Sequence, residues 1–102
     1  MSHTVLLVQC SADVFSRTYS DFECVKECID YVVSMFEEYL RRTNPHLQQV
    51  SYAANELFEF VDSLHDLSCM VLDKRQSVYV PYNKDWLKEK LLRKLQREEL
   101  VV

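Results

Sequence analysis

The sequence predicts an α+β domain in which a four-stranded antiparallel sheet carries three helices on one face. Short stretches of β-forming residues come in two pairs, one at the start of the 102-residue chain and one after residue 65. Stretches with helical spacing of apolar residues lie between and after these pairs, which gives the order β-β-α-α-β-β-α. No linker, repeat or low-complexity stretch interrupts the chain, so we expect one domain over residues 1–102.

Two short strands are expected at the start of the chain. Residues 3–9 contain a run of β-forming side chains that is too short for a helix. Residues 17–19 repeat this character over a shorter stretch, and residues 10–16 between them read as a loop without a specific turn signature.

A long helix is expected next. Ser20, with Glu23 three positions later, is the capping-box pattern that starts a helix. Residues 21–42 then carry apolar side chains at helical spacing. The helix is expected to stop at Asn44 and Pro45, because the residue before a proline avoids helical backbone.

The second half of the chain predicts a helix, a hairpin and a final helix. Residues 53–65 have apolar side chains at helical spacing. Residues 66–72 and 78–80 read as strands, joined by a short polar link that suits a hairpin. The final helix is expected over 84–99, where the preceding asparagine is a good N-cap.

Composition excludes several classes of function. The chain has no glycine, so it lacks the P-loop, the dinucleotide-binding G-x-G-x-x-G motif and the G-x-S-x-G nucleophile elbow. Its net charge of -4 and pI of about 5.3 argue against a large phosphate-reading surface. No apolar run approaches the ~20 residues that span a bilayer, and the N-terminus has no basic signal region. We expect a nuclear or cytoplasmic protein, including RNA-containing granules.

The cysteines predict free thiols and no metal site. No C-x-x-C pair occurs, and the chain has no export signal that would favour disulfides. Cys24 and Cys28 are four apart and could share a helix face with a metal, but no histidine has ligand spacing to complete the set. We expect no metal and no cofactor. The cysteines are Cys10, Cys24, Cys28 and Cys69.

The first strand is apolar on both faces. Leu6 faces one side of the sheet, whereas Val5 and Leu7 face the other. The helices can cover only one of these sides, unless one of them crosses over. A face with Val5 and Leu7 at its centre and polar His3 and Gln9 at its ends suits a self-complementary, two-fold contact. A homodimer through the open sheet face is the first expectation, and a covering helix is the alternative.

The long helix has a wider apolar arc than its own core needs. The arc spans roughly 200°, whereas a surface helix needs about 100°. One stripe consists of Phe22, Val25, Ile29, Val32, Val33, Phe36 and Leu40, and a second of Cys24, Cys28, Tyr31, Met35 and Tyr39. Either the other helices flank this one and use both stripes, or the second stripe lines a groove for a partner's peptide or helix.

Three residues at the end of the second expected helix are candidates for a small enzyme. Asp62, His65 and Asp66 lie close in sequence, and a histidine beside carboxylates can act as a general base. No activated nucleophile accompanies them, so a solvated helix end is the simpler interpretation. We expect no catalytic residues.

Three further features have competing interpretations. Trp86 is either a recognition anchor or a residue that packs the first turn of its helix on the core. Thr18 has an acidic residue at +3, which acidophilic kinases accept, and a phosphate there would lie near the proposed dimer face and oppose association. The last helix carries a basic run that is either a solvated face or a weak RNA contact. Its members are Lys84, Lys88, Lys90, Arg93, Lys94 and Arg97.

Several segments resemble the enhancer of rudimentary homolog family. The most specific are residues 1–9 and the run Pro-Tyr-Asn-Lys-Asp-Trp at 81–86, and the resemblance extends over residues 1 to about 95. Further matching segments are 17–19 with Asp21 and Glu23, 37–45, 57–69 and 88–90. The resemblance implies a small α+β protein that dimerises through its sheet, with Val5 and Leu7 at family dimer-core positions, and no enzymatic activity.

The resemblance also implies an adaptor. Such a dimer would bind short segments of RNA-processing proteins and so join RNA decay, splicing, small-RNA processing, transcription and cell division. The alternative is weak direct RNA binding by the basic side of the last helix. The expected dimer interface is His3, Val5, Leu7, Gln9, Arg17, Tyr19, Met70 and Tyr79, and the expected partner groove is Cys24, Cys28, Tyr31, Met35, Tyr39 and Trp86.

The chain departs from the usual family pattern at three places. Residues 10–16 replace a loop that is typically rich in proline, glycine and basic residues. Cys24 stands where many members carry serine, which leaves Thr18 as the one expected phosphorylation site. Residues 100–102 replace a polar tail. These differences predict a diverged paralogue, whose partners need not be those of the typical member.

Overall fold

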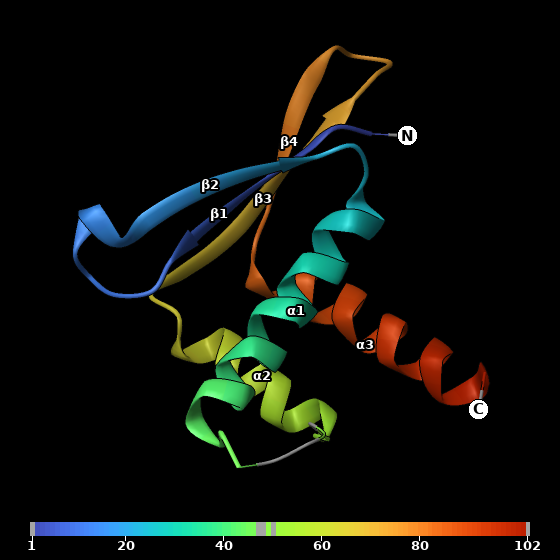
Figure 1. The fold of residues 1–102 in the computed structure, drawn as a ribbon. Helices are drawn as coiled ribbons and strands as arrows, with labels where there is room; N and C mark the ends of the chain where they lie inside the picture. Colours follow the sequence, from blue (N-terminus) through green and yellow to red (C-terminus); the bar gives the residue numbers. More distant parts are fainter. Residues whose placement is uncertain (1, 47–48, 50, 102) are drawn as a thin grey trace.

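The computed structural model describes residues 2–46, 49 and 51–101, with side chains to residue 97. Its elements follow the predicted order β-β-α-α-β-β-α, with one added turn of 3-10 helix, η1. They are β1 (Thr4–Gln9), η1 (Val14–Ser16), β2 (Arg17–Phe22), α1 (Val25–Thr43), α2 (Ala54–Ser63), β3 (Asp66–Asp73), β4 (Val78–Tyr82) and α3 (Lys84–Val101). The four strands form one antiparallel sheet, and the helices gather on one side of it (Figure 1). The predicted α+β fold class is confirmed.

The strand order is β2-β1-β3-β4, so β1 lies inside the sheet and is hydrogen-bonded on both edges. Leu6 pairs with Ser20 on one side and with Cys69 on the other. Directly opposite residues of antiparallel strands point to the same face. Alternate residues of β1 therefore divide the whole sheet into a helix-covered face and an open face.

The core lies between the helix-covered face and the three helices. Leu6 of β1 and Leu67 of β3 are fully buried on that face. Burying a leucine stabilises the fold by about 1.5–3 kcal/mol before the entropy of ordering is counted. The helices contribute buried side chains at helical spacing, among them Val32, Phe36, Leu57, Val61, Leu87 and Leu91.

Helix α3 is attached to its neighbours by polar contacts as well as by its buried leucines. Three of its lysines reach other elements: Lys84 Nζ donates to the Leu64 carbonyl at 2.5 Å, Lys88 Nζ contacts Asp62 at 2.5 Å, and Lys94 Nζ contacts Asp30 at 2.9 Å. The hydrogen bond from Lys94 lowers the pKa of the Asp30 carboxyl below its usual range. These contacts fix the position of α3 against α1 and α2.

The predicted start of the long helix is wrong. Ser20 does not cap a helix, because residues up to Phe22 continue β2 and pair with β1. Helix α1 begins at Val25 with Cys24 at the N-cap, where no side chain makes a capping hydrogen bond. Glu27 accepts a hydrogen bond from the backbone N–H of Glu23 at 3.1 Å, so part of a capping arrangement exists four residues later than predicted.

The other boundaries differ from prediction by a few residues. Helix α2 ends at Ser63, two residues early, because Leu64 has extended backbone with ψ 137°. The loop at 10–16 contains η1, which Asp13 caps by accepting from the Phe15 N–H at 2.9 Å. The Phe15 side chain is 92% exposed.

The β3–β4 hairpin turns without glycine. Asp73 Oδ1 accepts hydrogen bonds from the backbone N–H groups of Arg75 and Gln76. Ser77 then takes a left-handed backbone conformation with φ 57°. Glycine has no steric penalty in that region, whereas other residues strain by about 1–2 kcal/mol.

Candidate functional site

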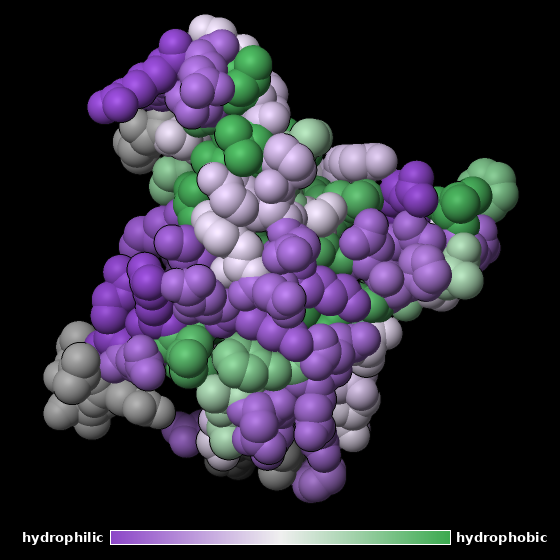
Figure 2. Space-filling view, turned by 180° about the vertical axis from the view of Figure 1, so that it is seen from behind, coloured by the Kyte–Doolittle hydropathy of each residue, from purple (hydrophilic) through white to green (hydrophobic). Residues whose placement is uncertain are grey.

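The open sheet face carries apolar side chains that no described element covers. The alternative of a covering helix is therefore wrong for the described residues. Val5 and Leu7 are half-buried at its centre, and the neighbouring strands expose Tyr19, Met70 and Tyr79. Figure 2 shows hydrophobic and weakly polar residues over β3 and β4, above the hydrophilic surface of α3.

The sheet register brings the predicted interface residues together on this open face. Val5 lies opposite Met70, and Leu7 lies opposite Tyr19. Gln9 lies opposite Arg17. Tyr79 lies opposite Leu72, and the His3 carbonyl accepts a hydrogen bond from the Leu72 N–H at 2.9 Å, which places Tyr79 and His3 at the same end of the face. All the residues chosen from the sequence thus share one face.

Hydrogen bonds hold the polar ends of the open sheet face. His3 Nδ1 lies 2.8 Å from the Tyr79 hydroxyl, and His3 Nε2 lies 3.3 Å from Asp21 Oδ2. At the other end, Arg17 Nε donates to Gln9 Oε1 at 3.0 Å. Gln9 is only 2% exposed, so in this end of the face Arg17 rather than Gln9 presents the accessible polar group.

Thr18 points to the opposite side of the sheet from Val5 and Leu7. It pairs with Val8, and its hydroxyl donates to the Val8 carbonyl at 3.4 Å. Because Val5 and Leu7 alternate with Val8, the Thr18 side chain points to the helix side of the sheet. A phosphate there would lie beside the open sheet face, between Arg17 and Tyr19, and not on it, so its effect on association stays a prediction.

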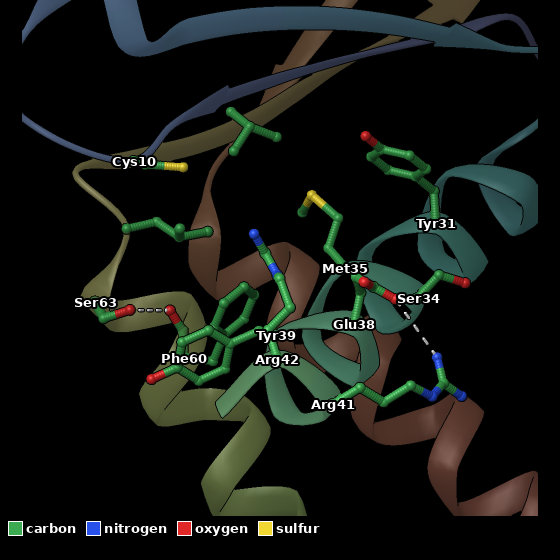
Figure 3. A pocket seen from close by; sticks show the side chains of 12 residues that line it. Cys10, Tyr31, Ser34, Met35, Glu38, Tyr39, Arg41, Arg42, Phe60 and Ser63 are labelled. Atoms are coloured by element: carbon green, nitrogen blue, oxygen red, sulfur yellow. Dashed lines mark hydrogen bonds and ion pairs between the residues drawn. The ribbon is translucent and has the colours of Figure 1, made fainter. Parts of the chain in front are cut away.

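A pocket of about 650 Å³ opens on the helix side, between α1, α2 and the end of β1 (Figure 3). We call it the α1–α2 pocket. It brings together Tyr31, Met35 and Tyr39 of the predicted partner groove, which rise along one face of α1. The described residues that line it are Val8, Cys10, Tyr31, Ser34, Met35, Glu38, Tyr39, Arg41, Arg42, Phe60, Ser63 and Leu64.

The other three predicted groove residues do not line this pocket. Cys28 is 1% exposed because its position on α1 faces the core, and burial raises the pKa of its thiol to about 12. Cys24 sits at the N-cap of α1. Trp86 stacks on Tyr82 with ring centroids 4.1 Å apart, and Lys90 lies over its ring. The packing interpretation of Trp86 is the one that matches its contacts.

Sequence reasoning missed the side of the pocket built by α2 and the basic end of α1. Phe60 contacts the ring of Tyr39 with centroids 5.3 Å apart and closes the floor. Arg42 follows Met35 by seven positions and Tyr39 by three, so helical spacing alone places it on the same stripe. A search for apolar residues at this spacing passes over Arg42 because its side chain is charged. Phe60 could not be found in this way, because it reaches the pocket only through the packing of α2 against α1.

The remaining candidates show no site geometry. Asp62 is paired with Lys88, and His65 is exposed. Within the described part of the chain no group of three or more His, Cys, Asp and Glu side chains is arranged to hold a metal ion. The same residues include no helix with the length and apolar character needed to cross a membrane.

The basic run on α3 is largely occupied by contacts within the chain. Lys84, Lys88 and Lys94 hold α3 against its neighbours, as described above. Arg93 pairs with Glu89 at 2.7 Å. Phosphate contacts are made by cations that are free to meet the nucleic acid, so this arrangement gives little support to an RNA-binding surface.

Comparisons with known proteins identify the family. The sequence model of the family described as Enhancer of rudimentary matches residues 1–100. The chain is 50% identical over 91 residues to the protein enhancer of rudimentary of Drosophila virilis, covering 89% of this chain and 88% of that one. It is 43% identical to the enhancer of rudimentary homolog of Caenorhabditis elegans over 91 residues (89% and 88%), and 40% identical to that of Dictyostelium discoideum over 97 residues (95% and 97%). The chain therefore belongs to the enhancer of rudimentary family.

Proposed function

We propose that this protein is a non-enzymatic homodimeric adaptor. Two copies would associate through the open sheet face, and each copy would bind a short segment of an RNA-processing protein in its α1–α2 pocket. The adaptor would scaffold an RNA-processing, small-RNA or gene-regulation complex, with links to cell division, in the nucleus or cytoplasm. The observation that carries the proposal is the presence of two separate apolar surfaces on opposite sides of one sheet.

The open sheet face supports self-association. Tyr19 is 63% exposed, and Met70 and Tyr79 are also exposed around the half-buried pair Val5 and Leu7. Apolar area removed from water stabilises an interface by roughly 25 cal/mol per Å² before association costs. A two-fold contact buries the same face on both copies, which suits an apolar centre with polar ends.

The α1–α2 pocket supports the adaptor role because it lies on the helix side of the sheet. A dimer that buries Val5 and Leu7 would leave Met35 and Tyr39 open to solvent on each copy. Each dimer would then present two equal sites. A methionine beside tyrosines forms an adaptable lining, typical of sites that accept linear segments.

Molar mass in solution across a dilution series tests the dimer. We expect about 24 kDa for the wild type, twice the 12.2 kDa chain, and folded monomers for Leu7→Arg. Thr18→Arg is the matched control, because it places the same charge on the neighbouring strand but on the opposite face. A wild type that stays at 12.2 kDa at micromolar concentration, or a Leu7→Arg protein that stays dimeric, contradicts the proposed interface.

Affinity capture from cells tests the adaptor role. The wild type, Leu7→Arg and Tyr39→Ala are used as bait in parallel, with the bound proteins identified by mass spectrometry. We expect RNA-processing proteins to bind the wild type and to be lost with Tyr39→Ala, whose side chain lines the pocket. If Tyr39→Ala retains every protein that the wild type binds, the pocket is not the partner site.

A further inference from the structure

We infer that the α1–α2 pocket recognises a carboxylate, with Arg42 as the group that binds it, and that its ligand is a short acidic segment with apolar side chains. The inference rests on the proposed adaptor function and specifies the chemistry of its partner. It starts from the charges at the pocket. Arg41 and Arg42 both line it, and Glu38 is the one acidic side chain among its described lining residues.

The two arginines differ in what they contact. Arg41 Nη1 lies 3.8 Å from Glu38 Oε2, so the charge of Glu38 is directed at Arg41. Arg42 makes no hydrogen bond or ion pair with any residue that the structure describes. Figure 3 shows the Arg42 side chain extending into the pocket beside Met35, whereas the Arg41 guanidinium is turned toward Glu38. One unpaired guanidinium is therefore directed into the space a ligand would fill.

The surroundings of Arg42 favour a planar anion. Met35, Phe60 and Leu64 give the pocket an apolar wall, and a guanidinium is hydrated weakly enough to work beside such a wall. Its N–H groups match the two oxygens of a carboxylate and form paired, charge-assisted hydrogen bonds with it. A phosphate group is usually held by several cations, whereas Arg42 is the one cation without an ion partner among the described lining residues, because Arg41 is paired with Glu38. An aspartate or glutamate side chain thus fits better than a phosphorylated one.

The volume of the pocket sets the size of the ligand. About 650 Å³ lies within the usual range of roughly 300–1,000 Å³ for sites that bury a small ligand. This is room for a few side chains of a peptide and not for a folded domain surface. We expect an apolar side chain of the segment to lie between Met35 and Phe60, and a neighbouring acidic side chain to reach Arg42.

The overall charge of the protein makes this one cation important. The net charge of -4 opposes non-specific association with acidic segments. Attraction to such a segment must therefore come from nearby groups, because charges beyond about 8–10 Å are screened at physiological salt. Removing Arg42 should accordingly change the preference of the pocket and not only weaken it.

Selection from a library of random twelve-residue peptides displayed on phage tests the inference. We expect the wild type to enrich peptides that combine apolar residues with aspartate or glutamate. Arg42→Gln should bind those peptides about tenfold to a hundredfold more weakly, the usual effect of losing a hydrogen bond to a charged group. Arg42→Glu should instead enrich lysine and arginine. Arg41→Gln is the matched control, and it should keep the acidic preference.

The outcomes separate this inference from the proposed function. If the selected peptides require Tyr39 but show no acidic preference, or bind Arg42→Gln as well as the wild type, the pocket binds segments and the carboxylate inference is wrong. If the wild type enriches no peptide that Tyr39→Ala loses, the proposed pocket function fails with it. If the wild type is a dimer and the Arg42→Gln protein is a monomer of 12.2 kDa, a second copy occupies the pocket. The inference of a separate partner is then overturned.

Discussion

Replacing Cys24 with serine should stabilise the protein through the start of α1. Cys24 is the N-cap residue, its backbone is extended with φ -154° and ψ 167°, and its side chain makes no capping hydrogen bond. A serine hydroxyl in that conformation can accept a hydrogen bond from the N–H of Glu27, the third residue of the helix. The Glu27 side chain already accepts a hydrogen bond from the Glu23 N–H at 3.1 Å. Replacing the sulfur of Cys24 by a hydroxyl oxygen therefore supplies the missing half of a capping arrangement.

The expected gain is about 1 kcal/mol, because a good N-cap side chain is worth roughly 0.5–2 kcal/mol relative to alanine. For a domain of this size, that corresponds to a rise of roughly 4–8 °C in the midpoint of thermal unfolding. Calorimetry or circular dichroism measures the midpoints of wild type, Cys24→Ser and Cys24→Ala at equal protein concentration, since self-association would shift the midpoint. Cys24→Ala removes the sulfur without adding a cap. If Cys24→Ser melts no higher than Cys24→Ala, the assignment of an uncapped N-cap at this position is wrong.

Three further predictions concern the thiols, one ion pair and one turn. Cys28 and Cys69 should resist a thiol reagent at pH 8 in the folded protein and react after denaturation, because burial raises their pKa values to about 12 and about 11; rapid labelling of either in the native state contradicts this. Asp30→Asn should lower the free energy of unfolding at pH 7 by about 1 kcal/mol, because the half-exposed carboxylate loses its ion pairs with Lys94 and Lys26. The pKa of Asp30 is lower in the folded protein than in the unfolded chain, so its stabilisation is complete above the unfolded pKa and is lost as the pH falls through the folded pKa. If Asp30→Asn differs from the wild type by the same free energy at low pH as at pH 7, this prediction is refuted. Ser77→Gly should raise the unfolding free energy by about 0.5–1 kcal/mol, because glycine adopts φ 57° without strain; chemical denaturation measures it, and a destabilised variant means that the turn is not strained.

The fold could be predicted from sequence because its signals are local. The alternation in β1 and the helical spacing in α1, α2 and α3 each appear within one short stretch. The extent of β2 could not be predicted in the same way. Ser20 and Glu23 form a good local capping pattern, but Ser20 also lies opposite Leu6, and ladder hydrogen bonds to β1 outweigh the cap. That competition is decided by a strand pair and not by the segment itself.

The parts of the two candidate surfaces that come from a single strand or a single helix could be predicted from the sequence. Leu7 was correctly placed on the open sheet face by parity along a single strand, and Met35 with Tyr39 by spacing along a single helix. Cys28 shares that helical spacing, but its neighbours from the sheet bury it, so periodicity could not separate it from the pocket residues. Phe60 comes from α2, and only the packing of two helices brings it to the pocket.

The interior position of β1 has a consequence for biosynthesis. Residue Leu6 pairs with Ser20 almost at once, but its second partner, Cys69, belongs to a strand made much later. At roughly 5–20 residues per second, the ribosome takes several seconds to make the intervening helices and β3. During that time the β1–β2 hairpin keeps an unpaired edge and two apolar faces, the features that favour wrong strand pairing. The nascent chain should therefore depend most on chaperone protection between the appearance of β2 and the completion of β3, and α1, made in that interval, is the first element able to cover one of those faces.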